Sequence, residues 1–423
     1  MTIAEQQKWS PDWSIPVFSL AERELRWSRV RRLMNREGID LIVCLTNTNH
    51  HGRGSANHRY LTQLGDNSEE QTVAFPLEGE VTAWHSRGGV WPSSNWLTDI
   101  RPTPRGCSAA ALIAWMHERG GYDTARIGIG GLTATDLVHV RAREGEVNYG
   151  SVEMLKAAFP KAEFVSASTV LGEARYVKTP EEIEFLRKAT RIAEQMLEAL
   201  IESAGPGVRE RHAFARMMFA SADADGSFAP MIGWVSGPRT APYHRIEQPT
   251  TRVFAEGDIL SLEIEGRWGS HIAQIDQTAS LGPAHAETLD AHARTIDAFD
   301  RVMSILKPGI TVRELIAGGD LKKPNSSVRT RLGAHGRGTG DDGPLIVTDR
   351  EYSDSFLDRV IEVGCSFVVK PYTYDTNREL ARWGDTVAVT ATGAERLGTR
   401  PKTLPELSKP LVPGRIDTSV SGA

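Results

Sequence analysis

The sequence predicts an α+β protein built of two domains, on the basis of three observations. The chain has 423 residues, of which 40% are hydrophobic and 24% are charged, so it has an ordinary globular composition and enough length for two hydrophobic cores. Strand-like and helix-like segments alternate through its first part, as they do in α/β domains. A helix-start signal near residue 180 then opens a second series of helices and strands.

The first predicted domain covers residues 1–170. Residues 19–36 place leucine, tryptophan and valine side chains at close to helical spacing, and residues 38–45 follow as an apolar run that predicts a buried strand. Further strands are predicted at residues 72–75, 81–84 and 126–129, with a helix at residues 109–118. This alternation predicts an α/β domain of ordinary size.

The second predicted domain covers residues 171–400 and opens on a long helix. Thr179 can cap this helix, Pro180 suits its first turn, and Glu182 completes a capping box. An apolar stripe then continues to about Ser203, where a glycine- and proline-containing phrase ends it. Alternating helices and strands follow.

The C-terminal residues 401–423 have a different composition. They contain several prolines, serines and glycines and show no periodicity. The sequence therefore predicts an extended tail that lies on a surface or on a partner subunit.

Charge and cysteine content exclude several classes of function. The 49 basic and 54 acidic residues give a net charge of −5 and are scattered along the chain, which argues against a nucleic-acid partner. The first residues lack the pattern of a signal peptide, and no stretch approaches the roughly 18 apolar residues that a membrane-spanning helix needs. Three dispersed cysteines indicate neither a disulfide framework nor a zinc site. We expect a soluble, cytoplasmic protein without a membrane partner.

Five phrases of the second domain occur in the order and at the spacing of a known superfamily. They are Arg175-Tyr-Val-Lys-Thr-Pro-Glu-Glu-Ile183, Ser236-Gly-Pro-Arg-Thr-Ala-Pro-Tyr-His244, Glu256-Gly-Asp-Ile-Leu-Ser-Leu262, Ala334-His-Gly-Arg-Gly338 and Arg382-Trp-Gly-Asp-Thr-Val387. The first resembles the helix that opens the catalytic domain of aminopeptidase P, prolidase and creatinase. The resemblance implies an N-terminal α/β creatinase-like domain followed by a pita-bread catalytic domain. It also implies a homodimer in which residues of the N-terminal domain reach the neighbouring site.

The resemblance further implies a site for two metal ions, held by two Asp residues eleven apart, one His and two Glu. In this sequence the Asp positions fall on Glu265 and Asp276, the His on His335, and the Glu positions on Lys370 and Gly384. A metal pair needs bridging carboxylates, and an ammonium beside it would cost several kcal/mol in a low dielectric. We therefore expect no metal and no other cofactor, with Lys370 as a resident substitute for the cation.

The remaining acid and base groups are the predicted catalytic residues, namely His244, Glu265, Asp276, His335 and Lys370. The position of His244 resembles that of the histidine that transfers a proton in creatinase. The two carboxylates are expected to hold the positive or NH-rich end of a substrate, and Lys370 or His335 to stabilise a developing oxyanion. Which histidine is the main acid/base stays open.

A second set is predicted to contact the substrate, and its members are Glu263, Arg239, Arg337, Tyr243, Trp234, His58 and Arg53. Glu263 precedes Glu265 by two residues, so both project from the same face of a strand. Arg239 and Arg337 could each fork onto a substrate carboxylate, although surface arginines look the same in a sequence.

The other members of this set are more ambiguous. Tyr243 and Trp234 could supply an aromatic wall or belong to the core. His58 and Arg53 follow the first strand, in the region from which creatinase-like dimers lend residues to the neighbouring site, but a polar loop explains them equally well.

These residues predict a metal-independent hydrolase that cleaves a carbon–nitrogen bond in a small polar substrate, such as a guanidino, ureido, cyclic amidine or amide compound. Three alternatives stay open: a carbon–sulfur lyase resembling dimethylsulfoniopropionate lyase, a metal-dependent Xaa-Pro peptidase, and a catalytically inactive pita-bread binding protein. Lys370 and Gly384 weigh against the first two, and the retained acid/base groups weigh against the third.

Overall fold

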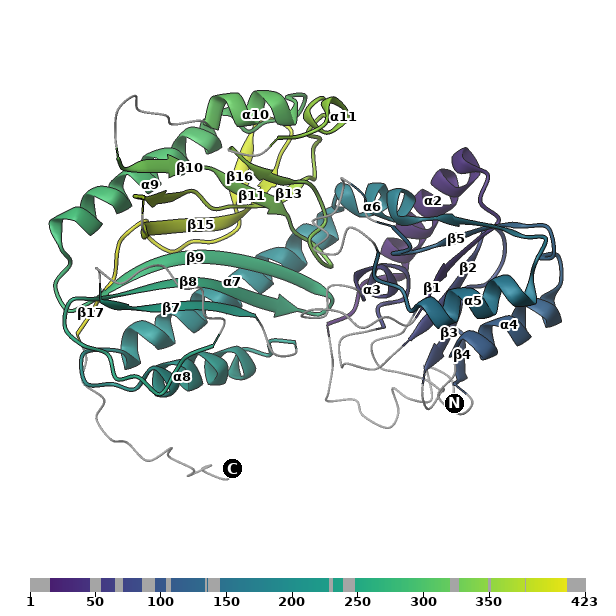
Figure 1. Cartoon of the computed structure of the whole chain (residues 1–423), viewed down its shortest axis with the longest axis horizontal. Helices are drawn as coiled ribbons and strands as arrows, with labels where there is room; N and C mark the ends of the chain where they lie inside the picture. Colours follow the sequence, from purple (N-terminus) through teal and green to yellow (C-terminus); the bar gives the residue numbers. More distant parts are fainter. Residues whose placement is uncertain are drawn as a thin grey trace.

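A computed structural model of the chain describes most of its residues. The described ranges are 16–45, 55–64, 71–85, 96–103, 108–133, 135, 145–227, 231–238, 248–319, 327–348, 351–376 and 378–408. They form two β-sheets, each with helices packed around it (Figure 1). Within these ranges no helix is long and apolar enough to cross a lipid bilayer.

The first sheet has six strands in the order β4-β3-β2-β1-β5-β6. Their bounds are β1 Leu41–Cys44, β2 Thr72–Pro76, β3 Thr82–His85, β4 Asp99–Pro102, β5 Arg126–Ile129 and β6 Glu163–Ser166. The sheet is mixed, because β1 pairs antiparallel with β2 and parallel with β5. The strands predicted after the first one are confirmed to within one residue at either end.

Five helices accompany this sheet: α2 Leu20–Glu37, α3 Ala56–Thr62, α4 Ser108–Arg119, α5 Tyr149–Ala158 and α6 Ser168–Tyr176. At the start of α2 the side chain of Ser19 accepts a hydrogen bond from the backbone N–H of Glu22. The helix ends at Gly38, whose φ of 64° is a left-handed conformation that glycine adopts without steric cost. The predicted helices in α2 and α4 are confirmed.

The helix that leads into the second sheet is α7, Pro180–Ser203. Its capping box is confirmed: the Thr179 hydroxyl accepts from the Glu182 N–H at 3.2 Å, and the Glu182 carboxylate accepts from the Thr179 N–H at 3.0 Å. Both bonds satisfy N–H groups that have no partner inside the helix. The local sequence therefore fixes where this helix begins.

The second sheet has eleven strands, with the main order β12-β11-β13-β15-β9-β8-β7. The strands on this path are β7 Ile232–Pro238, β8 Asp258–Trp268, β9 His271–Leu281, β11 Gly333–Gly336, β12 Leu345–Val347, β13 Ser366–Val369 and β15 Glu379–Val389. Four short strands join it at the sides: β10 Arg329–Arg331, β14 Tyr372–Tyr374, β16 Ala394–Arg396 and β17 Glu406–Leu407. Because β17 pairs in parallel with β9, part of the predicted tail belongs to this sheet.

Helices pack on this sheet in two groups. They are α7 with α8 Glu210–Asp223, and α9 Ala286–Ile305 with α10 Val312–Gly319 and α11 Asp354–Leu357. Helix α7 crosses β8 and β9, whereas α9 packs on β15. At the crossing of α7 and β8, a Cβ on Gly266 would collide with the backbone oxygen of Ala189, so glycine permits this close approach.

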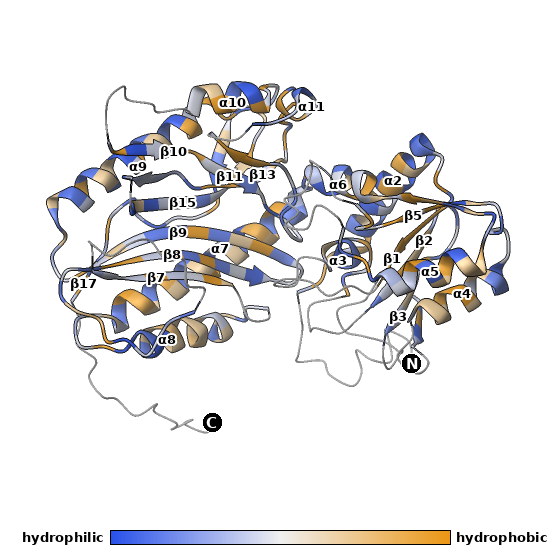
Figure 2. Ribbon diagram, in the orientation of Figure 1, coloured by the Kyte–Doolittle hydropathy of each residue, from blue (hydrophilic) through white to orange (hydrophobic). Residues whose placement is uncertain are grey.

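Hydropathy distinguishes the two sheets. Figure 2 shows β1 and β2 as almost wholly hydrophobic, whereas β8, β9 and β15 carry hydrophilic stretches along their length. Most of these polar residues are nevertheless buried. Buried charges must be paired. The paired charges on these three strands therefore mark the candidate location of a functional site.

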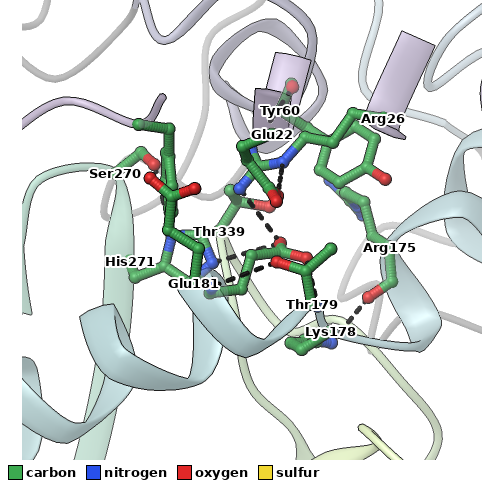
Figure 3. Close-up of polar contacts among 12 residues, drawn as sticks. Glu22, Arg26, Tyr60, Arg175, Lys178, Thr179, Glu181, Ser270, His271 and Thr339 are labelled. Atoms are coloured by element: carbon green, nitrogen blue, oxygen red, sulfur yellow. Dashed lines mark hydrogen bonds and ion pairs between the residues drawn. The ribbon is translucent and has the colours of Figure 1, made fainter. Parts of the chain in front are cut away.

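A buried network of charges joins the first domain to the second (Figure 3). Arg26 of α2 forms ion pairs with Glu22 at 2.7 Å and with Glu182 of α7 at 3.2 Å, and Glu182 also contacts His271 of β9 at 3.3 Å. These four residues, called the junction network below, are each at most 1% exposed. The guanidinium of Arg26 also lies over the ring of Tyr60 at 4.7 Å. The two domains are thus held together through desolvated charges.

Burial lowers the pKa of His271, and the carboxylate of Glu182 only partly opposes the shift. In an unfolded chain a histidine binds its proton at about pH 6.5. Below that pH the unfolded chain therefore binds more protons than the folded one. The contribution of His271 to the free energy of unfolding is fully present above about pH 6.5 and is lost as the pH decreases. The expected contribution is at most about 1.4 kcal/mol per pH unit.

Urea denaturation between pH 5 and 7, on the wild type and on His271→Gln, measures this effect. The glutamine amide can still donate to Glu182, so the variant removes the titration and keeps the contact. Burial also lowers the pKa of His58 and of His292, each to about 4, but those contributions cancel in the difference between the two proteins. If the free energies of unfolding of the wild type and of His271→Gln changed in parallel with pH, the prediction would be contradicted.

Candidate functional site

Four polar side chains on the β8–β9 hairpin share one face of the second sheet. In this antiparallel pair Glu263 lies opposite Asp276, and Glu265 lies opposite Gln274. Residues two apart on a strand point to the same side. All four are at most 5% exposed, so their charges are balanced inside the protein.

The first group of balancing charges surrounds Arg382 of β15. Its Nη1 donates to Glu263 at 2.6 Å and to Asp276 at 3.4 Å, while Nε and Nη2 each donate to the carboxylate of Glu379 at 2.6 Å. Lys370, which follows β13, places its Nζ 3.5 Å from Glu263. These five residues, the Arg382 cluster, combine three carboxylates with two cations.

The second group surrounds Arg337, which follows β11. Its Nη2 donates to Glu265 at 3.1 Å and also to the amide oxygen of Gln274, and its Nη1 donates to Asp341 at 2.9 Å. Arg267 contacts the other oxygen of Glu265 at 3.2 Å. We call these five residues the Arg337 cluster.

Gln274 joins the two clusters. Its Nε2 donates to Asp276 at 2.7 Å, while its oxygen accepts from Arg337. An amide can donate and accept at the same time, so it connects an anion on one side to a cation on the other. The two clusters therefore form one continuous polar network.

The surroundings of Asp276 change its pKa. Burial raises its pKa; Lys370 opposes the rise and Glu263 adds to it. The pKa of Arg382 is held well above its ordinary value, because its carboxylate partners Glu379 and Glu263 outweigh the opposing effect of burial. Asp276 thus keeps its proton to a higher pH than an ordinary aspartate, while Arg382 stays charged.

His335 lies in β11, opposite Val368 of β13. It is 4% exposed, and its Nδ1 lies 3.1 Å from the carbonyl oxygen of Gly336 and 3.5 Å from Asp341. Through Asp341 it is connected to the Arg337 cluster. The structure therefore brings together four of the five predicted catalytic residues, since Glu265, Asp276, His335 and Lys370 all belong to or adjoin this network.

Their pairing differs from the expected one. The sequence suggested that Lys370 takes the place of a cation held by Glu265 and Asp276; its ion-pair partner is Glu263, while its charge also opposes the rise in the pKa of Asp276. Glu265 turns instead to Arg337 and Arg267. The hairpin register explains the correction, because it places Glu263 and not Glu265 opposite Asp276.

The structure places three predicted substrate contacts in the interior of the protein. Arg337 is fully buried, and both of its terminal nitrogens bind partners within the network. Trp234 is 1% exposed and packs against Phe254, with ring centroids 6.2 Å apart, in the core beneath β7. His58 is buried in the first domain with Nε2 3.2 Å from the carbonyl oxygen of Cys44.

The remaining predicted site residues, His244, Arg239, Tyr243 and Arg53, lie outside the described residues. Their roles stay predictions from the sequence.

Sequence reasoning missed Gln274, Glu379, Arg382 and Asp341. A signal was present for two of them: Gln274 stands two residues before Asp276, and Arg382 opens one of the five superfamily phrases. Glu379 and Asp341 carry no such signal. They are recognised only through the arginines that they bind.

The residues at the implied metal positions do not fit a pair of metal ions. Lys370 places an ammonium 3.5 Å from Glu263. Gly384 offers no ligand, and a Cβ built on it would lie 2.6 Å from the Cβ of Lys370. Throughout the described ranges, no three His, Cys, Asp or Glu side chains are grouped so that they could hold a metal ion. Cations of the protein itself already occupy the oxygen atoms that a metal would need.

Comparison with known proteins shows a clear family relationship. Residues 184–391 match the family described as Metallopeptidase family M24. The chain is 26% identical over 257 residues to the Xaa-Pro dipeptidase of Pyrococcus furiosus, which covers 60% of this chain and 72% of that protein. It is 24% identical over 262 residues to the Xaa-Pro dipeptidase of Pyrococcus horikoshii, covering 60% and 71%.

Solved structures agree in fold. An X-Pro aminopeptidase from Thermotoga maritima superposes with a TM-score of 0.70 at 18% identity, covering 89% of this chain and 98% of that one. An Xaa-Pro dipeptidase from Bacillus anthracis gives a TM-score of 0.66 at 21% identity, covering 91% and 100%. At such identities the likeness shows the fold alone.

These findings correct the predicted function. A metal-independent hydrolase of small polar compounds was expected, but the relatives are named Xaa-Pro dipeptidases and the matching family is one of metallopeptidases. They agree better with the alternative of an Xaa-Pro peptidase.

The predicted fold, in contrast, is confirmed: an N-terminal α/β domain precedes a pita-bread domain that matches solved prolidase and aminopeptidase structures. Residues 184–391 therefore form a Metallopeptidase family M24 domain, in a chain whose fold matches that of solved aminopeptidase and dipeptidase structures.

Proposed function

We propose that this chain is a hydrolase of the peptidase class that cleaves a carbon–nitrogen bond in a short peptide, with Xaa-Pro dipeptides as the first substrates to test. The main support is that the M24 match at residues 184–391 contains every residue of the Arg382 and Arg337 clusters. Two relatives of this chain are named Xaa-Pro dipeptidase. The homodimer and the cytoplasmic location stay predictions.

Asp276 is the described residue best suited to proton transfer in such a reaction. Cleavage of a C–N bond requires a proton for the leaving nitrogen, and a carboxyl group with a raised pKa is an effective donor near neutral pH. Burial raises the pKa of Asp276, while Arg382 and Gln274 fix the position of its two oxygens.

The test is an assay of Xaa-Pro dipeptides and matched dipeptides without proline, each with and without added Mn²⁺, Co²⁺ or Zn²⁺. We expect hydrolysis of at least one Xaa-Pro dipeptide. Asp276→Asn, which keeps the shape of the side chain, should lower kcat by about two to four orders of magnitude. Circular dichroism and urea denaturation show whether the variant is folded. Absence of turnover by folded wild-type protein under every metal condition would refute the proposal.

A second candidate function, ligand binding without turnover, is favoured by one specific observation. Lys370, which forms an ion pair with Glu263, and Gly384 stand at the two positions where the resemblance implies metal-binding Glu residues. Calorimetric titration with the same dipeptides distinguishes the candidates. Saturable binding without any released amino acid would support the second.

A further inference from the structure

A buried segment connects the two domains to the site, and we call its six residues, Arg337–Asp342, the bridging loop. On the site side, Arg337 binds both Glu265 and Gln274. Asp341 accepts a hydrogen bond from Nη1 of Arg337 at 2.9 Å and so helps to fix the orientation of the guanidinium. This end of the loop therefore fixes the orientation of two side chains on the β8–β9 hairpin.

On the opposite side, the bridging loop is held by the N-terminal domain. Arg59 of α3, which is 2% exposed, donates from Nη2 to the carbonyl oxygen of Thr339, 280 residues away in the sequence. Thr339 in turn donates to Asp342, from its N–H at 2.8 Å and from its hydroxyl at 3.0 Å. The same Asp342 carboxylate lies 3.3 Å from Arg175. Both domains thus contact the same short stretch of backbone.

The bridging loop has little freedom to absorb a movement. Every one of its residues is buried. The N–H of Arg337 donates to Ser366 at 3.0 Å, and the carbonyl oxygen of Gly338 accepts from Ile272 at 2.8 Å. A Cβ on Gly338 would lie 2.7 Å from Lys178. In such tight packing a shift at one residue is passed to its neighbours.

We propose that Arg59 is a positioning residue for the site: by holding Thr339 it fixes the bridging loop, and the loop in turn sets Arg337 against Glu265 and Gln274. The N-terminal domain thereby controls the geometry of the polar network through the bridging loop. The kinetic part of the test rests on the proposed function, whereas the structural part does not.

Arg59→Met removes the donor and keeps most of the side-chain volume. Arg29→Met is the matched control, because Arg29 also donates to backbone carbonyls far away in the sequence, those of Ala174 at 2.9 Å and Val177 at 2.7 Å, and both acceptors lie outside the bridging loop. Arg59→Lys keeps a donor for the carbonyl and should restore much of the wild-type behaviour. Urea denaturation compares the stability of all three variants.

Hydrogen exchange of the folded proteins gives the structural readout. In Arg59→Met we expect the amides of Arg337, Thr339 and Ile272 to exchange about tenfold faster or more. In Arg29→Met they should keep the wild-type rates even if overall stability falls equally. Unchanged exchange of these amides in Arg59→Met would overturn the proposal.

Kinetics give the second readout where the wild type hydrolyses a dipeptide. Misplacement of the polar network should lower kcat by about tenfold or more in Arg59→Met and change KM by less than about twofold. An equal loss of kcat in Arg29→Met would refute a specific role for Arg59. If the exchange result is obtained but the wild type turns over no dipeptide, the proposed function fails and the positioning role stands.

Discussion

Replacement of Arg26 by Met is expected to lower the free energy of unfolding by about 3–5 kcal/mol. Arg26 is the shared cation of the junction network, and its replacement removes the ion-pair partner common to the buried carboxylates of Glu22 and Glu182. The methionine fills much of the volume, so the loss reports on charge more than on a cavity. Denaturation by guanidinium chloride at pH 7 measures it.

Arg36→Met is the matched control on the same helix. Arg36 forms ion pairs with Glu37 and Glu173, but its side chain is 51% exposed, so its replacement should cost less than about 1 kcal/mol. Adding Glu22→Gln to the Arg26 variant removes one of the two stranded charges and should recover part of the lost stability. If the two arginine variants were equally stable, the junction network would not hold the domains together.

The junction network also shows which part of the fold the sequence could not predict. The capping box of α7 was readable because Thr179 and Glu182 are three residues apart. The ion pair of Arg26 with Glu182 spans more than 150 residues, and on α2 alone Arg26 looks like any exposed helix charge. Long-range pairs of this kind leave no periodic signal.

The sequence predicted many of the residues that form the candidate site, but it did not predict which of them form ion pairs with one another. The superfamily phrases led to Lys370, His335 and the acidic hairpin. An eleven-residue interval, however, separates Glu263 from Gln274 as well as Glu265 from Asp276, and only the structure shows that Glu263 is the carboxylate beside Lys370. The sequence left Trp234 open between an aromatic wall and the core for a related reason, because its packing against Phe214 of α8 and Phe254 is a tertiary effect.

Exchange of Lys370 for Glu is expected to lower the free energy of unfolding by about 2–4 kcal/mol at pH 7 in the presence of EDTA. The substitution removes the ammonium 3.5 Å from Glu263 and adds a fourth carboxylate to the Arg382 cluster, which then has a single cation. Like charges in a poorly hydrated site repel strongly. The measurement is urea denaturation, repeated with millimolar Mn²⁺.

Two comparisons make this result decisive. Lys370→Met removes the cation without adding an anion. Arg382 still pairs with Glu263 at 2.6 Å and the Lys370 side chain is 16% exposed, so the expected loss in the free energy of unfolding is only about 1 kcal/mol.

Mn²⁺ should raise the stability of Lys370→Glu and leave that of the wild type unchanged. Only the variant has carboxylates in excess of cations that a divalent ion can bridge. Equal stabilisation of the wild type by Mn²⁺ would show that the ion-paired site accepts metal after all. Full stability of Lys370→Glu in EDTA would show that Lys370 does not balance the buried carboxylates.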